Sequence, residues 1–209
     1  MPGTRVGDKR QRILDAAVRV FAERGFFHSR VNDVAEAAGV AGGTIYLYFK
    51  NKDDLLISLF EDRMDFILGT LRAALAEESD ATARLRRFIE LHFQLVESDP
   101  ALADVLSVEL RQSSKFVREY KAHKFYEYLG VAEEILREGV DDGFFRSDLD
   151  PKVFRRALFG ALDEVTLTWV HGQREGRTPP CSLENATNTI HNLFSSGLCC
   201  PTPADRSDP

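Results

Sequence analysis

The sequence predicts an all-α protein, in which a three-helix helix-turn-helix domain precedes a helical body, with about nine helices in total. Apolar residues recur at spacings of three and four along most of the 209-residue chain. No alternating apolar runs bounded by turns indicate strands. Hydrophobic residues make up 44% of the chain and charged residues 29%, as in a globular protein with a substantial core.

Glycine and capping residues predict where the helices begin and end. Gly25 is expected to cap the first helix and Gly39 to turn the chain after the second, because glycine adopts a left-handed backbone without strain. Ser29 is a candidate N-cap, and Pro151 suits the first turn of a later helix. The expected helices span residues 9–25, 29–39, 43–49, a long segment from Asn51 or Asp53 onward, 81–97, 100–110, 115–139, 151–171 and 182–196.

Charge divides the chain near residue 52. Residues 1–52 hold nine Lys and Arg against five Asp and Glu, whereas residues 53–209 hold 18 against 28. A basic head on an acidic body suggests that only the head approaches nucleic-acid phosphates.

Several classes of protein are disfavoured. No apolar run approaches the ~18 residues of a membrane span, and the N-terminal residues lack the apolar core of a secretory signal. The three cysteines, Cys181, Cys199 and Cys200, form no disulfide framework and fit a reducing cytoplasm. Metal-ligand spacings, nucleophile elbows, P-loops and HExxH motifs are absent from the sequence. We therefore expect no catalytic residue, metal or cofactor, and a cytoplasmic location.

The segment from Val31 to Lys52, VNDVAEAAGVAGGTIYLYFKNK, is typical of a helix-turn-helix. Its first helix offers small apolar residues for close packing, and Gly39 permits the sharp turn. The second helix places Ile45 and Phe49 four residues apart on an inner face, so its other side chains can face a major groove about 12 Å wide. Packing within a three-helix unit is the alternative role for Tyr46 and Phe49.

The candidate DNA contacts combine groups near the bases with groups that bind phosphate. Tyrosine hydroxyls, lysines and backbone N–H groups at a helix start suit phosphate, whereas the start of the second helix lies nearest the bases. These candidates are Ser29, Arg30, Gly43, Thr44, Tyr46, Leu47, Tyr48, Lys50 and Lys52.

These motifs resemble the TetR family of bacterial transcriptional regulators, most strongly over residues 12–59. The resemblance rests on ILDAAVRVFAERGF followed by VNDVAEAAGVAGGTIYLYFKNKDDLL. It implies a fourth helix that links head to body and a homodimer on a palindromic double-stranded operator. It also implies DNA contacts at Ser29 or Arg30, Thr44, Tyr46, Tyr48 and Lys52.

Two positions depart from the family. Ala41 and Gly42 stand where relatives often hold a Ser or Thr cap and a polar or basic residue. Direct base readout therefore falls on Gly43, Thr44 and Leu47, with water and DNA shape adding the rest.

The body resembles the TetR-type, FadR-like repressors of fatty-acid degradation, in GTIYLYFKNKDDLLISLF, VELRQSS and FGALDEVTLTWV. That resemblance implies long-chain acyl-CoA as the effector that releases the repressor from DNA. An apolar tunnel suits the acyl chain, at ~0.8 kcal/mol per buried CH₂, and basic or polar groups suit the CoA end. Asp163 is costly to bury alone, so Arg111 is its candidate partner. The candidate ligand-binding residues are Leu102, Val105, Leu106, Arg111, Gln112, Lys115, Phe116, Tyr120, Phe125, Leu129, Phe159, Leu162, Asp163, Thr166 and Trp169.

The resemblance also implies that the last two helices form the dimer. The candidate interface residues are Val153, Ala157, Ala161, Val165, Leu183, Ile190, Leu193 and Phe194. We therefore expect a DNA-binding domain at residues 1–52, a ligand-binding and dimerisation domain at 53–196, and a flexible tail at 197–209. A regulator that responds to another small hydrophobic ligand or drug is the main alternative. An enzyme, or a structural dimer that packages DNA, is disfavoured by the missing catalytic motifs and the acidic body respectively.

Overall fold

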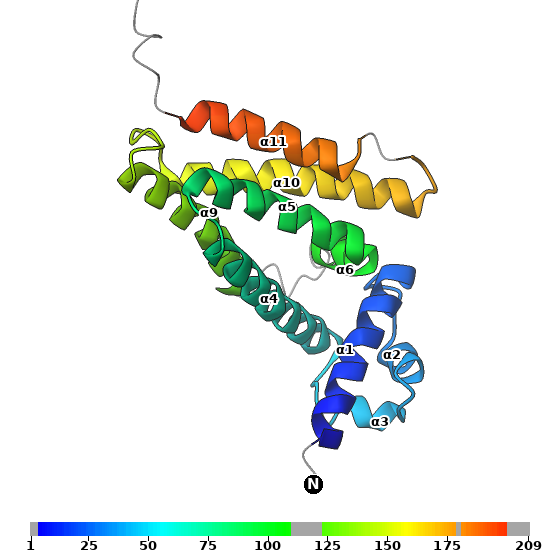
Figure 1. Cartoon of the computed structure of the whole chain (residues 1–209). Coiled ribbons are helices and arrows are strands. Elements are labelled where there is room, and N and C mark those ends of the chain that lie inside the picture. The colour runs from blue at the N-terminus through cyan, green and yellow to red at the C-terminus, as the bar shows by residue number, and fades with distance from the viewer. Residues whose placement is uncertain (1–3, 110–122, 179–180, 200–209) are drawn as a thin grey trace, which may run out of the picture. The chain divides into compact units, whose positions relative to one another are not determined.

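The chain folds almost entirely into helices in a computed structural model, which describes residues 4–109, 123–178 and 181–199 (Figure 1). Those segments contain nine α-helices, one π-helix and no strand beyond an isolated bridge between Phe145 and Cys199. The predicted all-α fold is confirmed. The elements are α1 (Thr4–Arg24), α2 (Val31–Ala37), α3 (Gly42–Ile45), α4 (Lys52–Ala76), α5 (Ala81–Ser98), α6 (Pro100–Asp104), the π-helix η1 (Val105–Glu109), α9 (His123–Asp141), α10 (Pro151–Arg174) and α11 (Leu183–Leu198).

Packing divides the chain into two compact units. Among the described residues, the first comprises residues 4–66, 98–109 and 123–124, and the second comprises residues 67–97, 125–178 and 181–199. α4 therefore contributes its residues through Phe66 to the first unit and the remainder to the second. Because these units follow packing, the functional division at residue 52 stays a prediction. α11 continues to Leu198, whose side chain is buried, so the first residues of the expected tail belong to a helix.

α2 packs against both α1 and α3. Gly25 ends α1 with a φ of 77°, and Gly39 follows α2 with a φ of 65°, as expected for these glycines. The Arg12 guanidinium donates a hydrogen bond to the Ala38 carbonyl at 2.6 Å, which satisfies a carbonyl left free at the end of α2. The inner face of α1 buries the residues that their spacing predicts: Ile13, Ala17, Val20 and Phe21.

A network of ion pairs joins α1 to the first half of α4. Arg10 Nη1 lies 3.2 Å from Asp62 Oδ1. Arg63 pairs with Asp15, and its Nη1 atom lies 4.0 Å from Asp62 Oδ2. Within the same unit, α6 and η1 also pack against α1. α1 is thus held by several elements that follow residue 52.

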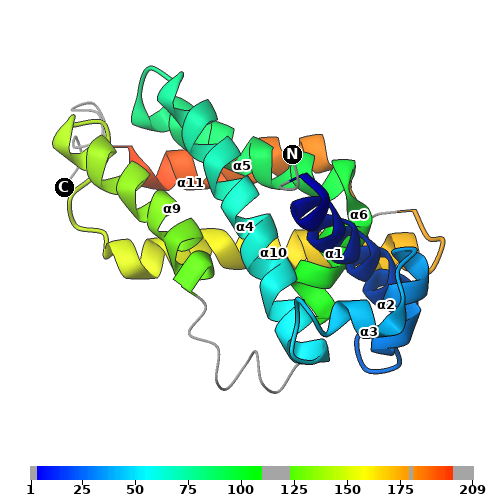
Figure 2. The same cartoon turned by 90° about the horizontal axis from the view of Figure 1, so that it is seen from below.

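The second unit is a bundle in which α10 and α11 lie side by side (Figures 1 and 2). Arg86 on α5 donates to the Asn188 side-chain oxygen on α11 at 2.8 Å. Arg155 on α10 pairs with Glu133 on α9 at 2.9 Å. These polar contacts fix how α5, α9, α10 and α11 are staggered. Within the described segments, none of the helices has the length and apolar content that crossing a bilayer requires.

Candidate nucleic-acid interface and ligand-binding region

The third helix of the helix-turn-helix is short. α3 ends at Ile45, and the chain continues through turns in which Leu47 N–H donates to Thr44 and Tyr48 N–H donates to Ile45. These bonds reach back three residues instead of four, so the expected helix over residues 43–49 is α-helical only at its start. Ile45 and Phe49 nevertheless lie on the inner face, at 1% and 2% exposure, as their spacing predicts.

The outer side of α3 and the following turns presents an exposed surface, which we call the recognition face. Tyr46 is 58% exposed and Leu47 80% exposed, and Lys50 is also exposed. Thr44 and Tyr48 are half-buried, and Gly43 has open space where a Cβ would stand. Packing therefore leaves Tyr46 and Leu47 free to contact another molecule, and it uses Phe49 as core.

Ser29 occupies a different place from the predicted one. Its side chain is buried, and its hydroxyl donates to the carbonyls of Gly25 at 2.6 Å and Val20 at 3.3 Å. The N-cap of α2 is Arg30, whose backbone N–H donates to the Asp33 carboxylate at 2.7 Å. The Ser29 N–H also donates to the Gly25 carbonyl, at 3.2 Å, so both donors of Ser29 close the α1–α2 loop, and the DNA contact expected from the backbone at Ser29 stays a prediction. Arg30 is exposed and keeps its side chain available.

The half-buried Lys52 side chain also binds other groups of the protein. Its ammonium donates to three backbone carbonyls of the α1–α2 loop, Phe26 at 2.6 Å, Ser29 at 2.9 Å and Phe27 at 3.2 Å. It also lies 4.5 Å from the centre of the Phe26 ring. An ammonium has three protons, and all three are used. Burial lowers the pKa of Lys52, with a smaller opposing effect from Asp53. The predicted phosphate contact is therefore replaced by a structural one.

The close approach of Asn32 explains why a residue without a Cβ stands at position 42. A Cβ at this position would lie 2.8 Å from the Asn32 side-chain oxygen on α2. The small residue allows α3 to begin close against α2. No sequence pattern predicts this contact, because Asn32 and Gly42 belong to different helices.

The candidate ligand-binding residues fall into three groups. Arg111, Gln112, Lys115, Phe116 and Tyr120 lie outside the described residues, so their roles and the Arg111–Asp163 pairing stay predictions. Three residues lie in the first unit on α6 and η1, where Leu102 and Val105 are buried and Leu106 is half-buried. The remaining seven lie on α9 and α10 in the second unit: Phe125, Leu129, Phe159, Leu162, Asp163, Thr166 and Trp169.

The structure brings several of the second-unit candidates into one apolar core. The rings of Phe125 and Phe159 pack edge to face, with centroids 4.9 Å apart. Leu162 is fully buried, and Thr166 is buried at 2% exposure. Asp163 lies at the margin, half-buried.

Two residues that sequence reasoning missed lie in this core. His92 on α5 contacts the Tyr128 hydroxyl on α9 through Nδ1, at 2.7 Å, and the Thr166 hydroxyl on α10 through Nε2, at 3.1 Å. Burial lowers the pKa of His92 to about 4 and raises that of the Tyr128 hydroxyl. Both side chains are therefore uncharged at neutral pH. The helical spacing places His92 on the apolar side of α5 with Leu85, Phe88 and Ile89, but it does not reveal the partners of His92 on α9 and α10.

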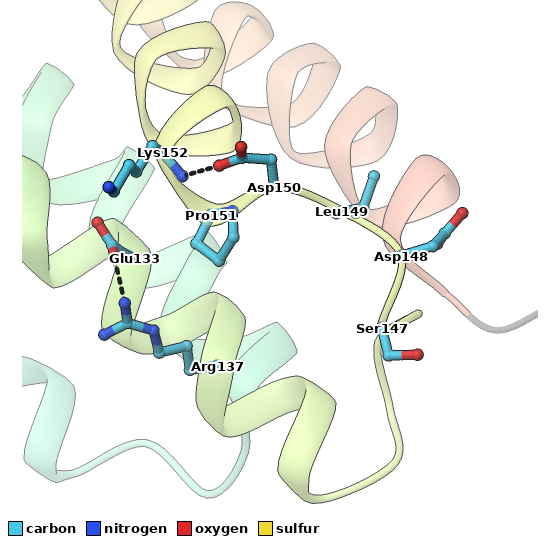
Figure 3. Close-up of a pocket in the computed structure, with 8 residues that line it drawn as sticks. All are labelled: Glu133, Arg137, Ser147, Asp148, Leu149, Asp150, Pro151 and Lys152. Carbon is cyan, nitrogen blue, oxygen red and sulfur yellow. Dashed lines mark hydrogen bonds and ion pairs between the residues drawn. The ribbon is translucent and has the colours of Figure 1, made fainter.

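A separate hollow of about 440 Å³ lies between α9 and the loop that leads into α10 (Figure 3). Its wall is mostly polar and charged. Glu133 pairs with Arg137, and Asp150 caps α10 by accepting from the Lys152 N–H at 2.7 Å. Only Leu149 and Pro151 among its eight lining residues are apolar. This hollow is therefore unsuited to a long hydrocarbon chain.

The outer face of α10 and α11 carries the dimer candidates. Val153, Ala157 and Leu193 are exposed, with Leu193 at 68%, and Ala161 and Val165 are half-buried. We call these five residues the α10–α11 seam. An apolar hollow of about 110 Å³ adjoins it, lined by Val165, Trp169 and Cys181 among others. Cys181 is a free thiol.

Three further dimer candidates pack inside the protomer. Leu183 and Ile190 are buried within the protomer at 6% exposure each, so their predicted contact with a second protomer stays a prediction. Phe194 is half-buried and packs its ring against Phe154, with centroids 5.8 Å apart. Leu183, Ile190 and Leu193 are all apolar in sequence, and only the three-dimensional packing distinguishes the buried ones from the exposed one. Across the part of the chain that the structure describes, no cluster of three His, Cys, Asp or Glu side chains could hold a metal.

Two protein families match consecutive segments of the chain, which together span residues 13–197. Residues 13–59 match the bacterial regulatory proteins of the tetR family, and residues 60–197 match the C-terminal region of YsiA-like proteins. The chain belongs to the TetR family. This TetR-family chain is a DNA-binding transcription regulator and not an enzyme, as the helix-turn-helix predicts.

Bacterial regulators of fatty-acid metabolism are among its relatives. The fatty acid metabolism regulator protein of Bacillus subtilis is 38% identical over 190 residues, which is 91% of this chain and 95% of that protein. The KstR2 repressor of Rhodococcus jostii is 28% identical over 92% of each chain. The resemblance to FadR-like regulators is thereby confirmed at the level of sequence.

Solved structures give the same relationship. The crystal structure of FadR from Bacillus subtilis in complex with stearoyl-CoA superposes on this TetR-family chain with a TM-score of 0.82. The two share 38% identity over 90% of this chain and 98% of that one. FadR from Bacillus halodurans gives the same TM-score and identity over 90% and 95% of the two chains.

Proposed function

We propose that this chain is a homodimeric repressor of fatty-acid degradation genes that leaves its operator when it binds long-chain acyl-CoA. The observation that carries the proposal is the 38% identity, over nearly the full length, to a FadR that has been solved with stearoyl-CoA. Identity at this level over both units supports a shared ligand class as well as a shared fold. The regulator would act in the cytoplasm, where acyl-CoA and DNA meet.

The DNA-binding role rests on the recognition face. Tyr46, Leu47 and Lys50 project from a rigid three-helix group, and Arg30 lies exposed at the start of α2. Two such groups in a dimer would enter successive major grooves, with centres about 34 Å apart, and would read a palindrome. Because Ser29 and Lys52 bind the protein's own carbonyls, phosphate contact falls on Arg30, Lys50 and the tyrosine hydroxyls.

The effector role rests on the core of the second unit. An acyl chain needs apolar walls, which Phe125, Phe159 and Leu162 supply from two helices. Burial of each CH₂ contributes about 0.8 kcal/mol, so a chain of sixteen or eighteen carbons would contribute strongly even when only part of it is enclosed. The polar hollow beside Glu133 lacks such walls.

Dimerisation rests on the α10–α11 seam. Ala157 and Ala161 are small, so a second pair of helices could approach closely, and Val153, Val165 and Leu193 would be removed from water. An exposed apolar strip of this kind on two adjacent helices is typical of an interaction surface. The seam is self-complementary in a two-fold dimer, in which each residue lies opposite residues of the same patch.

Release from DNA requires the effector to bind one conformation more tightly than another. We infer that α4 carries the change, because it runs from the second unit into the first. The ion pairs of Arg10 and Arg63 with Asp62 and Asp15 tie its first half to α1. Movement of α4 would therefore move the recognition face with it.

Native mass spectrometry of the purified regulator, with and without added stearoyl-CoA, tests the ligand class. The proposal predicts binding of one stearoyl-CoA per protomer, in a species with twice the 23.5 kDa chain mass. Retention of a different hydrophobic or drug-like molecule, without binding of stearoyl-CoA, would support a regulator of another response. Hydrolysis of the thioester would contradict the assignment to non-enzymatic regulators.

A further inference from the structure

Three polar side chains form a hydrogen-bonded chain in the core of the second unit. Tyr128 on α9, His92 on α5 and Thr166 on α10 are joined through the two ring nitrogens of His92, at 2.7 Å and 3.1 Å. Tyr128 and Thr166 are buried, at 6% and 2% exposure. Three helices thus place their polar groups at one point of an apolar interior.

Aromatic rings surround this chain. The Tyr128 ring lies 5.1 Å from Phe88 and 6.4 Å from Phe159, measured between centroids. His92 packs edge to face on Phe93 at 5.3 Å. Hydrogen bonds are stronger in such surroundings than in water, and an unsatisfied donor is correspondingly costly. A buried polar chain therefore persists only when its groups are paired or when it has a partner to meet.

The three side chains carry more donor protons than their two mutual hydrogen bonds use. The two hydroxyls and a neutral imidazole carry one donor proton each, which makes three donors for two hydrogen bonds. Either Tyr128 donates to the ring and Thr166 keeps a proton, or Thr166 donates to the ring and Tyr128 keeps one. Among the described residues, neither hydroxyl makes a further hydrogen bond. One donor therefore remains at one end of the chain in either arrangement.

An uncharged acceptor fits this donor best. The imidazole is neutral at physiological pH because burial lowers the pKa of His92 to about 4. It therefore supplies no positive charge to offset a carboxylate, whose transfer into an apolar core is costly. A carbonyl oxygen can accept one hydrogen bond there without bringing a charge.

We propose that the His92–Tyr128–Thr166 chain recognises the carbonyl oxygen of a bound acyl thioester by donating its remaining proton. This inference rests on the proposed function, since it assigns a residue-level role within the acyl-CoA site. The three residues would therefore contribute to ligand specificity. They would distinguish an acyl thioester from a free fatty acid and from an alkyl ligand of equal length that lacks the carbonyl.

A pair of matched ligands tests the proposal on the unaltered protein. Stearoyl-CoA and the thioether S-octadecyl-CoA differ at the carbonyl oxygen, so their dissociation constants can be compared by isothermal titration calorimetry. We expect stearoyl-CoA to bind at least about tenfold more tightly, because only its carbonyl oxygen can accept the remaining proton. Equal affinities would overturn the inference and leave the proposed function intact. Binding of neither ligand would overturn the proposed function itself.

Variants of Tyr128 and Thr166 test whether their hydroxyls cause the difference in affinity between the two ligands. Tyr128→Phe combined with Thr166→Val removes both hydroxyls and should bring the affinity ratio of the two ligands towards one. Tyr126→Phe is the matched control, because Tyr126 is 51% exposed on the same helix and lies outside the chain. It should keep the wild-type ratio. A double variant that folds, as shown by circular dichroism, and keeps the wild-type ratio would contradict the assignment.

Discussion

The ammonium of Lys52 lies 2.9 Å from the carbonyl oxygen of Ser29, so the first residue of α4 holds the loop between α1 and α2. Two residues that resemble DNA contacts in sequence are thus partners within the protein. Lys50, two residues earlier, is exposed, and among the described residues its side chain makes no hydrogen bond or ion pair. The two lysines of the KNK motif should therefore behave differently when replaced.

Lys52→Ala should lower stability, because three carbonyls lose a charged donor. The expected cost is about 1–3 kcal/mol, or a melting temperature lower by roughly 2–10 °C. Lys50→Ala should leave the melting temperature unchanged and weaken DNA binding, with a salt dependence reduced by about one unit of slope. Thermal unfolding and fluorescence anisotropy at several salt concentrations measure both effects. Equal melting temperatures for the two variants would contradict the structural role of Lys52.

His92 should make the regulator sensitive to mild acid. Its pKa lies near 4 in the folded protein, below the ordinary value of 6.5, so the unfolded chain binds a proton more readily. Stability due to the neutral ring is fully present above about pH 6.5 and is lost as the pH falls towards 4. The loss should reach up to about 3 kcal/mol.

Urea unfolding at pH 7.5, 6 and 5 tests this expectation. His92→Gln cannot titrate, so its stability should start lower at pH 7.5 and fall less steeply than that of the wild type. His171→Gln replaces an exposed histidine at the end of α10 and should retain the wild-type slope. Parallel profiles for wild type and His92→Gln would show that the buried ring does not govern the acid response.

Gly139 and Gly130 on α9 should respond in opposite ways to alanine. A Cβ on Gly139 would lie 2.0 Å from Phe145 Cδ2, and Phe145 is buried, so Gly139→Ala must displace the ring. The expected cost is about 1–3 kcal/mol. Gly130 has open space at its Cβ position, so Gly130→Ala should gain about 0.5–1 kcal/mol of helix propensity. Chemical denaturation measures the free energy of unfolding of both variants. Equal destabilisation by the two substitutions would contradict the close packing of Gly139 against Phe145.

Ala157→Glu should separate the dimer without unfolding the protomer, because Ala157 is exposed in the single chain and central to the proposed seam. Gln94→Glu adds the same charge at an exposed position of α5 and serves as the control. Light scattering after size exclusion should give twice the 23.5 kDa chain mass for wild type and control, and the chain mass for Ala157→Glu. A monomeric wild type, or an Ala157→Glu variant that remains dimeric, would contradict the proposal that the α10–α11 seam forms the dimer interface.

The helical fold could be predicted because its signals are local. Ile45 and Phe49 repeat with the helical period, and Gly25 and Gly39 mark turns, so each signal lies within a few residues of the feature it predicts. Lys52 could not be assigned in this way, because its partners are backbone carbonyls, which leave no pattern in the side chains.

Contacts between distant residues explain the other differences. His92 is 36 residues from Tyr128 and 74 from Thr166, so no spacing rule connects them. Leu183, Ile190 and Leu193 all suit an apolar helix face, and only the packing of α11 places the first two inside and the third outside. The exposure of Leu47 follows from the inner positions of Ile45 and Phe49, whereas the DNA contacts of the recognition face stay predictions.

The most direct test of the account is the release of DNA by acyl-CoA. An operator selected from random double-stranded DNA by the purified regulator would be labelled, and its anisotropy followed during titration with stearoyl-CoA. We predict dissociation at about one stearoyl-CoA per protomer, while equal concentrations of stearate or free CoA leave the complex intact. An operator complex that persists after mass spectrometry shows stearoyl-CoA bound would contradict the central claim.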